Sequence, residues 1–187
     1  MILNKLNKTP HRIYARKCII KDISHLDYVN FLEQNHLHGR GINVTLRKGL
    51  YHSNKLVSVI GITQEGEIAR FASLINHNII GGFGKLFKSL KDKIKFTYAD
   101  QDWTPDSTKS VYYKHFSNIS STEPQLSYYN YNKELLESRQ KYQNHKLKDL
   151  FNYGFEESNE TKENFLASKN ILTLYRTVNY KFTNQLC

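Results

Sequence analysis

Ile79-Ile80-Gly81-Gly82-Phe83-Gly84-Lys85-Leu86-Phe87 is the stretch of the chain that bears most strongly on its fold. It lies between a strand-like run at residues 67–72 and a helix-like run at residues 85–90. Glycines at a strand-to-helix turn let backbone N–H groups approach an anion, and the start of a helix adds partial positive charge. The stretch therefore indicates a phosphate or pyrophosphate site, with four candidate residues: Gly81, Gly82, Gly84 and Lys85. An ordinary tight connection between a strand and a helix is the alternative.

The composition is that of a globular protein with one domain, or one domain and an appendage, since the chain has 187 residues. It contains no run of about 18 apolar residues, so no membrane span is expected. Its first residues lack the apolar segment of a secretory signal. Two cysteines, Cys18 and Cys187, are too few for a disulfide framework or a zinc site. We expect a cytoplasmic protein with reduced cysteines, no metal and no membrane partner.

Positive charge is concentrated in the first hundred residues, which hold 16 of the 27 Lys and Arg but 7 of the 17 Asp and Glu. Such an imbalance favours an anionic partner, DNA first and a phosphorylated cofactor second. The candidate nucleic-acid-binding residues are Arg12, Arg16, Lys17, Arg40, Arg47 and Lys48. Interleaved Tyr14 and Tyr51 would add base stacking to backbone contacts. The alternative is a solvated basic face.

Hydrophobic periodicity and turn residues predict the order of elements before residue 133. Ser24 is expected to cap a helix that stops near Gly39, and residues 52–54 to join two strands as a hairpin loop. The expected strands are 13–20, 43–51, 55–63, 67–72, 94–99 and 125–131, and the other expected helices are 85–90 and 111–116. This alternation predicts a mixed α/β domain at 11–132, after a flexible arm at 1–10.

The last third of the chain differs in its sequence pattern. Residues 133–187 are predicted to be a helical C-terminal appendage that returns to the core. It is helical and charged through Leu150, then turns at Gly154 into an acidic helix. Two strand-like runs end it, at 172–175 and 180–182.

The order of elements before residue 133 resembles that of the GNAT acyltransferase fold. In that family the fourth strand, the glycine turn and the next helix hold the pyrophosphate of acyl-coenzyme A. The family's Q/R-x-x-G-x-G/A motif can be placed on residues 79–84, with its two glycines at Gly82 and Gly84 and with Ile79 in place of Gln or Arg. The resemblance implies a GNAT-like α/β fold and acetyl-CoA or another acyl-CoA as cofactor.

In finer detail the chain resembles the domain that follows the nuclease in phage-encoded Hef-like homing endonucleases. The matching segments are residues 13–18, 31–39, 49–51, 56–58, 70–71, 81–87, 98–103, 174–175 and 179–182. Only about twelve residues precede the first segment, where those relatives have a Vsr-like nuclease domain. The resemblance implies a phage or mobile-element accessory domain that binds DNA without its nuclease, with a separately encoded nuclease as a further partner.

The Mom family of phage DNA-modifying proteins is a more distant resemblance, carried by Asn35-His36 and by Tyr98-Ala99-Asp100. It supports the alternative function, an acyl-CoA-dependent transferase that modifies DNA. In either case the oligomeric state is open.

Four residues are candidates for catalysis under the transferase hypothesis. Glu67 stands where many acyltransferases keep a general base, and Tyr112 where the family has a tyrosine that protonates the leaving thiolate. His36 is a proton carrier or phosphate contact, and Asp100 ends a strand at the edge where α/β folds place ligand groups. The alternatives are a solvated Glu67, a packed Tyr112, a structural His36 and an Asp100 that caps a turn.

The chain is not expected to cut DNA, because phosphodiester hydrolysis usually needs a metal held by carboxylates. Among the acidic residues of the first hundred positions, only Glu65 and Glu67 are close in sequence. Asp100, Asp102 and Asp106 form a denser set, but they flank Trp103 and Pro105 in what is predicted to be a loop.

Overall fold

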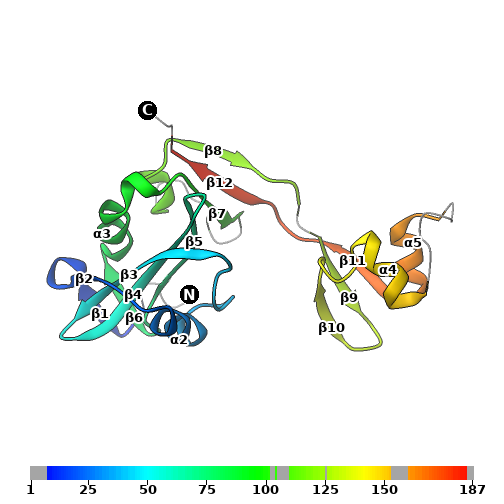
Figure 1. Cartoon of the computed structure of the whole chain (residues 1–187), viewed down its shortest axis with the longest axis horizontal. Helices are drawn as coiled ribbons and strands as arrows, with labels where there is room; N and C mark the ends of the chain where they lie inside the picture. The colour runs from blue at the N-terminus through cyan, green and yellow to red at the C-terminus, as the bar shows by residue number, and fades with distance from the viewer. Residues whose placement is uncertain (1–7, 102–103, 105–109, 125, 153–159, 185–187) are drawn as a thin grey trace. The chain divides into compact units, whose positions relative to one another are not determined.

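The computed structural model describes residues 8–101, 104, 110–124, 126–152 and 160–184, and these form two units (Figure 1). The first unit contains Met1–Ala99, Trp103–Ser120 and Tyr180–Cys187. The second contains Asp100–Asp102 and Ser121–Asn179. The domain limits predicted above, 11–132 and 133–187, separate β9 (Leu126–Asn130) from β10 (Leu135–Ser138), whereas both strands lie in the second unit. Each unit is described by itself.

A seven-stranded mixed sheet organises the first unit, and its strand order is β2-β3-β4-β5-β7-β12-β8. Strands β2 to β5 pair antiparallel, whereas β5 and β7 run parallel. The strands are β2 (Ile19–Asp22), β3 (Val44–His52), β4 (Lys55–Thr63), β5 (Glu67–Ser73), β7 (Phe96–Asp100), β12 (Asn179–Thr183) and β8 (Asn118–Ser121). The predicted mixed α/β class is confirmed.

The hairpin between β3 and β4 is confirmed at the predicted loop. Ser53 and Asn54 have φ angles of 48° and 62°. Two successive residues with positive φ make the turn whose twist matches that of the flanking strands. β4 is buried along most of its length, as expected of a central strand covered on both faces.

Two helices cover opposite faces of this sheet. Val59 of β4 belongs to the core cluster of α2 (His25–Asn35), whereas Ile60 belongs to the cluster of α3 (Gly82–Ser89). Successive residues of a strand point to opposite faces, which places the two helices on different sides. The α3 side is largely aromatic, with Phe83 and Phe87 against Phe71 and Phe116.

Helix α2 begins as predicted, since the Oγ of Ser24 accepts a hydrogen bond from the backbone N–H of Asp27 at 3.0 Å. It ends at Asn35, four residues before the predicted stop at Gly39. The side chain of Asn35 helps to end the helix at this position. Its Nδ2 donates to the carbonyl of Phe31, and its Oδ1 accepts from the N–H of Ile75. Asn35 thereby joins the helix end to the segment after β5.

The region before α2 differs from the single strand predicted at 13–20. It consists of β1 (His11–Tyr14), a 3₁₀ turn η1 (Ala15–Lys17) and β2. β1 pairs in parallel with β6 (His77–Ile80), a strand that the sequence pattern did not predict. The turn interrupts the strand because the buried Ala15 packs into the core beside α3.

The helix predicted at 111–116 is wrong, because only a 3₁₀ turn, η4 (Tyr112–Lys114), forms there. Aromatic residues at Tyr112, Tyr113 and Phe116 have weak helix propensity, and each packs against Phe182 instead. Another 3₁₀ turn, η2 (Lys91–Lys93), links α3 to β7. Strand β8 then follows, which was also not predicted.

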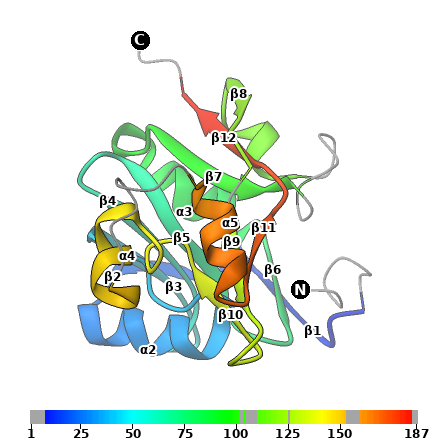
Figure 2. The same cartoon turned by 90° about the vertical axis from the view of Figure 1, so that its right-hand side faces the viewer.

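The second unit is a three-stranded antiparallel sheet with two helices. Its strand order is β10-β9-β11, with β9 at Leu126–Asn130, β10 at Leu135–Ser138 and β11 at Ile171–Tyr175. The helices are α4 (Asn144–Phe151) and α5 (Lys162–Ser168), and α5 packs along β11 (Figure 2). The predicted helix from 133 to 150 is therefore wrong in its first half, where β10 forms. The turn predicted at Gly154 lies outside the described residues.

The chain leaves the main sheet after β8 and returns to it through β12. Backbone hydrogen bonds join Ser117 N–H to the carbonyl of Thr183 at 3.2 Å and Thr122 N–H to that of Asn179 at 2.8 Å. The second unit is thus inserted between two neighbouring strands. Among the described residues, no helix combines the length and apolarity needed to cross a bilayer.

Candidate binding site at the glycine turn

The glycine turn connects β6 to α3 through a left-handed residue. Gly81 has a φ angle of +78°, which favours glycine, and it occupies the N-cap position of α3. Gly81 brings no side chain to cap the helix, so the first N–H groups of α3 are open to another acceptor. Its carbonyl accepts the bond from Lys85 N–H at 3.0 Å, which closes the first helical turn.

A cavity of about 500 Å³ lies against this turn. Its lining residues come from β1, η1, the end of β6, α3 and the segment after η4: Tyr14, Ala15, Arg16, Ile80, Gly81, Gly84, Lys85, Lys88 and His115. Three of these carry a positive charge, and no carboxylate is among the described residues that line the cavity. Volume, backbone donors and charge all suit a phosphorylated ligand.

The three glycines have different roles. A methyl group at Gly84 would lie 3.3 Å from His115 Nε2, and one at Gly81 would meet only Ala15 Cβ at 3.8 Å. A methyl group at Gly82 would instead lie 2.9 Å from Ile79 Cγ2, in the buried core. Gly81 and Gly84 therefore face the cavity, whereas Gly82 allows the helix to pack.

Lys85 forms part of the cavity wall by holding η1. Its Nζ donates to the carbonyl of Ala15 at 2.9 Å and to that of Cys18 at 2.5 Å. The ammonium group therefore positions the segment that carries Arg16. Burial raises the pKa of the neighbouring Cys18 thiol and Lys85 opposes this shift, so the thiol stays protonated near neutral pH.

His115 lies across the cavity from η1 and was not among the predicted site residues. Its ring packs 4.7 Å from that of Phe87 and 5.6 Å from that of Phe83, measured between centroids. Burial, with the charges of Lys88 and Lys114, lowers its pKa. The imidazole is therefore neutral near pH 7, with one ring nitrogen as donor and the other as acceptor.

Lys88 also lines the cavity and was also not among the predicted site residues, although its spacing in the sequence could have identified it. It follows Gly81 by seven positions and Gly84 by four, which places all three on one face of a helix. His115 had no such signal, because it reaches the cavity from a distant part of the chain.

Tyr112 packs beside the cavity without being one of its lining residues. Its ring lies 5.4 Å from Phe83 and 5.3 Å from Phe182, measured between centroids. Burial raises the pKa of its hydroxyl, so Tyr112 keeps its proton throughout the neutral range.

The other three predicted catalytic residues do not line this cavity. Glu67 begins β5 half-buried, and burial raises its pKa against the opposing charge of Arg70. Burial, Arg70 and His38 together lower the pKa of His36 to about 4, so this imidazole is uncharged at neutral pH. Its Nδ1 accepts from the N–H of His38 at 3.1 Å. Asp100 is half-buried at the end of β7.

The six predicted nucleic-acid contacts fall into two groups. Arg12, Arg16 and Lys17 are exposed and lie close together on β1 and η1, with the Arg16 guanidinium 5.0 Å from the ring centroid of Tyr14. Of the other three, two have side chains engaged within the fold: Arg47 Nη1 donates to Val44 O, and Lys48 pairs with Asp22 at 3.0 Å. Arg40 is exposed, and it is its backbone N–H that donates to Glu33 Oε1.

Within the described residues, no group of three or more His, Cys, Asp or Glu side chains is placed to hold a metal ion. Asp102, Trp103, Pro105 and Asp106 lie outside those residues, so the loop predicted there is not described.

The fold has similarity to solved structures. No protein-family model and no curated protein matches the chain. A solved structure described as an acetyltransferase from the GNAT family, from Colwellia psychrerythraea, is similar with 12% identity and a TM-score of 0.35. The match covers 60% of this chain and 47% of that structure, so the chain spans less than half of its length.

Proposed function

We propose that this protein is an acyl-CoA-dependent transferase that binds the pyrophosphate of its coenzyme in the cavity at the glycine turn. The observation that carries this proposal is the basic lining of that cavity, which combines Arg16 of η1 and Lys88 of the last turn of α3 with the uncapped start of the same helix at Gly81. A diphosphate needs several cations and backbone donors converging on one place, and this combination provides both.

The sheet supports the same function. β5 and β7 pair only at Glu67↔Phe96 and Ile68↔Thr97 among the described residues. The rest of β5 therefore has backbone groups on its β7 side that are free of a neighbouring strand. The pantetheine arm of coenzyme A is extended and carries two amides, so it can bond to such groups as an added strand does.

The proposed reaction moves the acyl group from the coenzyme sulfur to a nucleophile of the acceptor. The nucleophile bonds to the acyl carbon, the carbon–sulfur bond breaks, and the electron pair leaves on sulfur. Glu67 would accept the proton that the nucleophile loses, since its raised pKa improves it as a base. Tyr112 would give its proton to the thiolate, since its hydroxyl stays protonated.

Calorimetry with acetyl-CoA tests the binding step on the full chain. Replacing Arg16 and Lys88 together by Gln should weaken binding about tenfold or more, because each contact to phosphate is charge-assisted. Lys91→Gln, an exposed lysine of η2 outside the cavity lining, is the matched control and should bind like the parent.

Fragments of the coenzyme locate the contact. ADP, which carries the diphosphate, should compete with acetyl-CoA, whereas pantetheine should compete much less. Absence of heat with both acetyl-CoA and ADP would remove the transferase proposal. Tyr112→Phe should bind normally but turn over more slowly with an amine acceptor, as followed by release of free thiol.

A second candidate function is DNA binding, as in an accessory domain of a Hef-like homing endonuclease. The exposed group Arg12, Arg16 and Lys17 favours it, because none of the three forms an ion pair with a carboxylate in the described part of the chain. Their position beside the cavity also suits a transferase whose acceptor is DNA. Fluorescence anisotropy with a labelled duplex tests it, and the absence of binding at low salt would exclude this function.

A further inference from the structure

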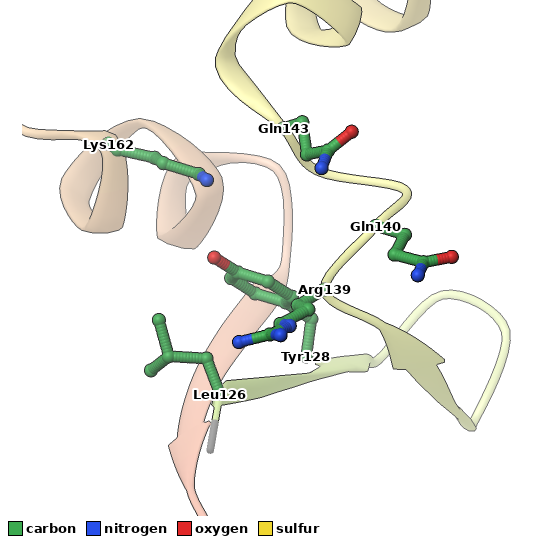
Figure 3. Close-up of a pocket in the computed structure, with 6 residues that line it drawn as sticks. All are labelled: Leu126, Tyr128, Arg139, Gln140, Gln143 and Lys162. Carbon is green, nitrogen blue, oxygen red and sulfur yellow. The ribbon is translucent and has the colours of Figure 1, made fainter. Parts of the chain in front are cut away.

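The second unit contains a cavity of its own, with a volume of about 310 Å³. Six residues line it: Leu126, Tyr128, Arg139, Gln140, Gln143 and Lys162 (Figure 3). They come from β9, from the segment between β10 and α4, and from the start of α5. Neither the resemblances nor the proposed transferase activity assigns this place a role.

Two side chains that line this cavity, Arg139 and Lys162, carry a positive charge. Arg139 and Lys162 come from different elements, and their charged ends both lie beside the Tyr128 ring (Figure 3). Neither forms an ion pair with a carboxylate among the described residues. The nearby Glu137 is already neutralised, since Lys141 lies 2.5 Å and Lys133 3.8 Å from its Oε1. Among the described residues that line the cavity, two carry a positive charge and none carries a negative charge.

Its floor is rigid and aromatic. Tyr128 is 1% exposed and packs edge-on against Tyr142, with 4.9 Å between ring centroids. Lys162 Nζ lies 5.6 Å from the centroid of the Tyr128 ring. The Tyr128 hydroxyl lies on the side of its ring nearer to Lys162 (Figure 3). A phenolic hydroxyl can donate a hydrogen bond.

Backbone donors lie at the same place. α4 begins at Asn144, and the side chain of its N-cap residue, Gln143, makes no capping hydrogen bond. The Gln143 carbonyl accepts a hydrogen bond from Lys146 N–H at 2.8 Å, and the partial positive charge of the helix start adds to that of the two side chains.

We propose that this cavity binds a phosphate ester, with its oxygens between Arg139 and Lys162. The planar guanidinium can bond two oxygens at once, and the ammonium group supplies a point charge opposite it. The volume exceeds what a carboxylate fills and suits a phosphate that carries a further group, such as a nucleoside. The phosphate belongs to a free nucleotide or to a nucleic-acid strand, which share this chemistry.

The test is a titration of full-length, ¹⁵N-labelled protein, followed through amide signals. The host carries Arg16→Gln and Lys88→Gln, so that the cavity at the glycine turn does not compete for the probe. Inorganic phosphate and then adenosine 5′-monophosphate should shift the amide signals of Gln140, Gln143 and Lys162. Arg139→Gln in this host should weaken the binding of the monophosphate about tenfold.

Lys148→Gln is the control, because Lys148 is an exposed lysine of α4 that does not line the cavity. It should leave the affinity unchanged, and an equal loss in both variants would overturn the proposal. Failure of phosphate and monophosphate to shift these signals would do the same. A short single-stranded oligonucleotide that binds more tightly than the monophosphate, and depends on Arg139, would identify the source as nucleic acid. The reverse order would identify a free nucleotide. Because the readout is local, this result does not depend on the transferase proposal.

Discussion

The two cavities are both lined by cations, but they are built in different ways. The cavity at the glycine turn uses backbone: Gly81 and Gly84 keep it free of side chains at the start of α3. The cavity of the second unit has no glycine among the described residues that line it, and Tyr128 is part of its lining. A site built from backbone leaves a short signature in the sequence, whereas a site built from side chains can draw them from anywhere. The comparison predicts where substitutions are tolerated.

The largest effect should come from Gly82→Val, although Gly82 is not part of either cavity. A side chain there enters the core against Ile79, and overpacking of this kind costs about 1–3 kcal/mol of folding free energy. Gly84→Ala should change stability by less than about 1 kcal/mol, because only the His115 ring has to move. Urea unfolding measures both. Equal losses would show that the two glycines are not divided between packing and cavity as described.

DNA should bind to the first unit and not to the second. Residues 121–179 contain eight Lys and Arg and eight Asp and Glu, so the positive excess lies in the first unit. Replacing Arg12, Arg16 and Lys17 together by Gln should make the salt dependence of log K shallower by about 3, since each phosphate contact contributes about 0.9 to the slope. Arg176→Gln, an exposed arginine of the second unit, is the control and should leave the slope unchanged. If the triple change left the slope unaltered, these three residues would not be the ones that contact DNA.

The pH dependence of stability should reflect His36, which belongs to neither cavity. Its pKa is about 4 in the folded state against an ordinary value of 6.5, so the unfolded state binds more protons between these values. Stability should therefore fall as the pH drops from 6.5 to 4, by about 1 kcal/mol once partial solvent exposure is allowed for. The raised pKa of Glu67 acts in the opposite direction over the acidic end of this range.

His36→Asn tests the assignment, because its amide oxygen can replace Nδ1 as acceptor for the His38 N–H. Chemical unfolding of this variant at pH 4.5 and 7 should show a smaller difference in stability than the parent. If the difference were unchanged, His36 would not be the group responsible.

No effect at all is expected from incubating the protein with supercoiled plasmid and Mg²⁺ or Mn²⁺. Among the described residues that line the two cavities there is no carboxylate, the ligand that holds metals for phosphodiester hydrolysis. Gel electrophoresis measures conversion to nicked circles. Nicking that disappears in Asp100→Asn or Asp102→Asn would reveal a nuclease centre outside both cavities.

The sequence predicted most reliably what local chemistry determines. The Ser24 cap, the hairpin at 52–54 and the helix that follows the glycine turn all depend on residues within a few positions of one another. The pairing of β1 with β6 depends on residues more than sixty positions apart, and no local pattern encodes it. The same applies to β10, whose residues have a helical composition but pair with β9.

The candidate site shows the same limit. Gly81, Gly84, Lys85 and Arg16 line the cavity as the glycine motif and the basic segment suggested. Helical spacing could have predicted that Lys88 lines the cavity. No such pattern indicates His115, because it lies after β7 in the sequence, far from the glycine turn. Glu67, His36 and Asp100 were chosen by analogy of position, and the fold places none of them in the cavity lining.

The neighbouring positions of β8 and β12 have a consequence for how the chain is organised. Their backbone bonds, from Ser117 to Thr183 and from Thr122 to Asn179, bring together the two points where the chain enters and leaves the second unit. In topological terms, β8 and β12 are the two strands of a β-hairpin, and the whole second unit takes the place of the loop between them. The entropic cost of closing such a connection grows only slowly with its length, so a large insertion there adds little burden to the host sheet. We therefore expect that the second unit could be shortened to a tight turn between β8 and β12 while the main sheet keeps its strands.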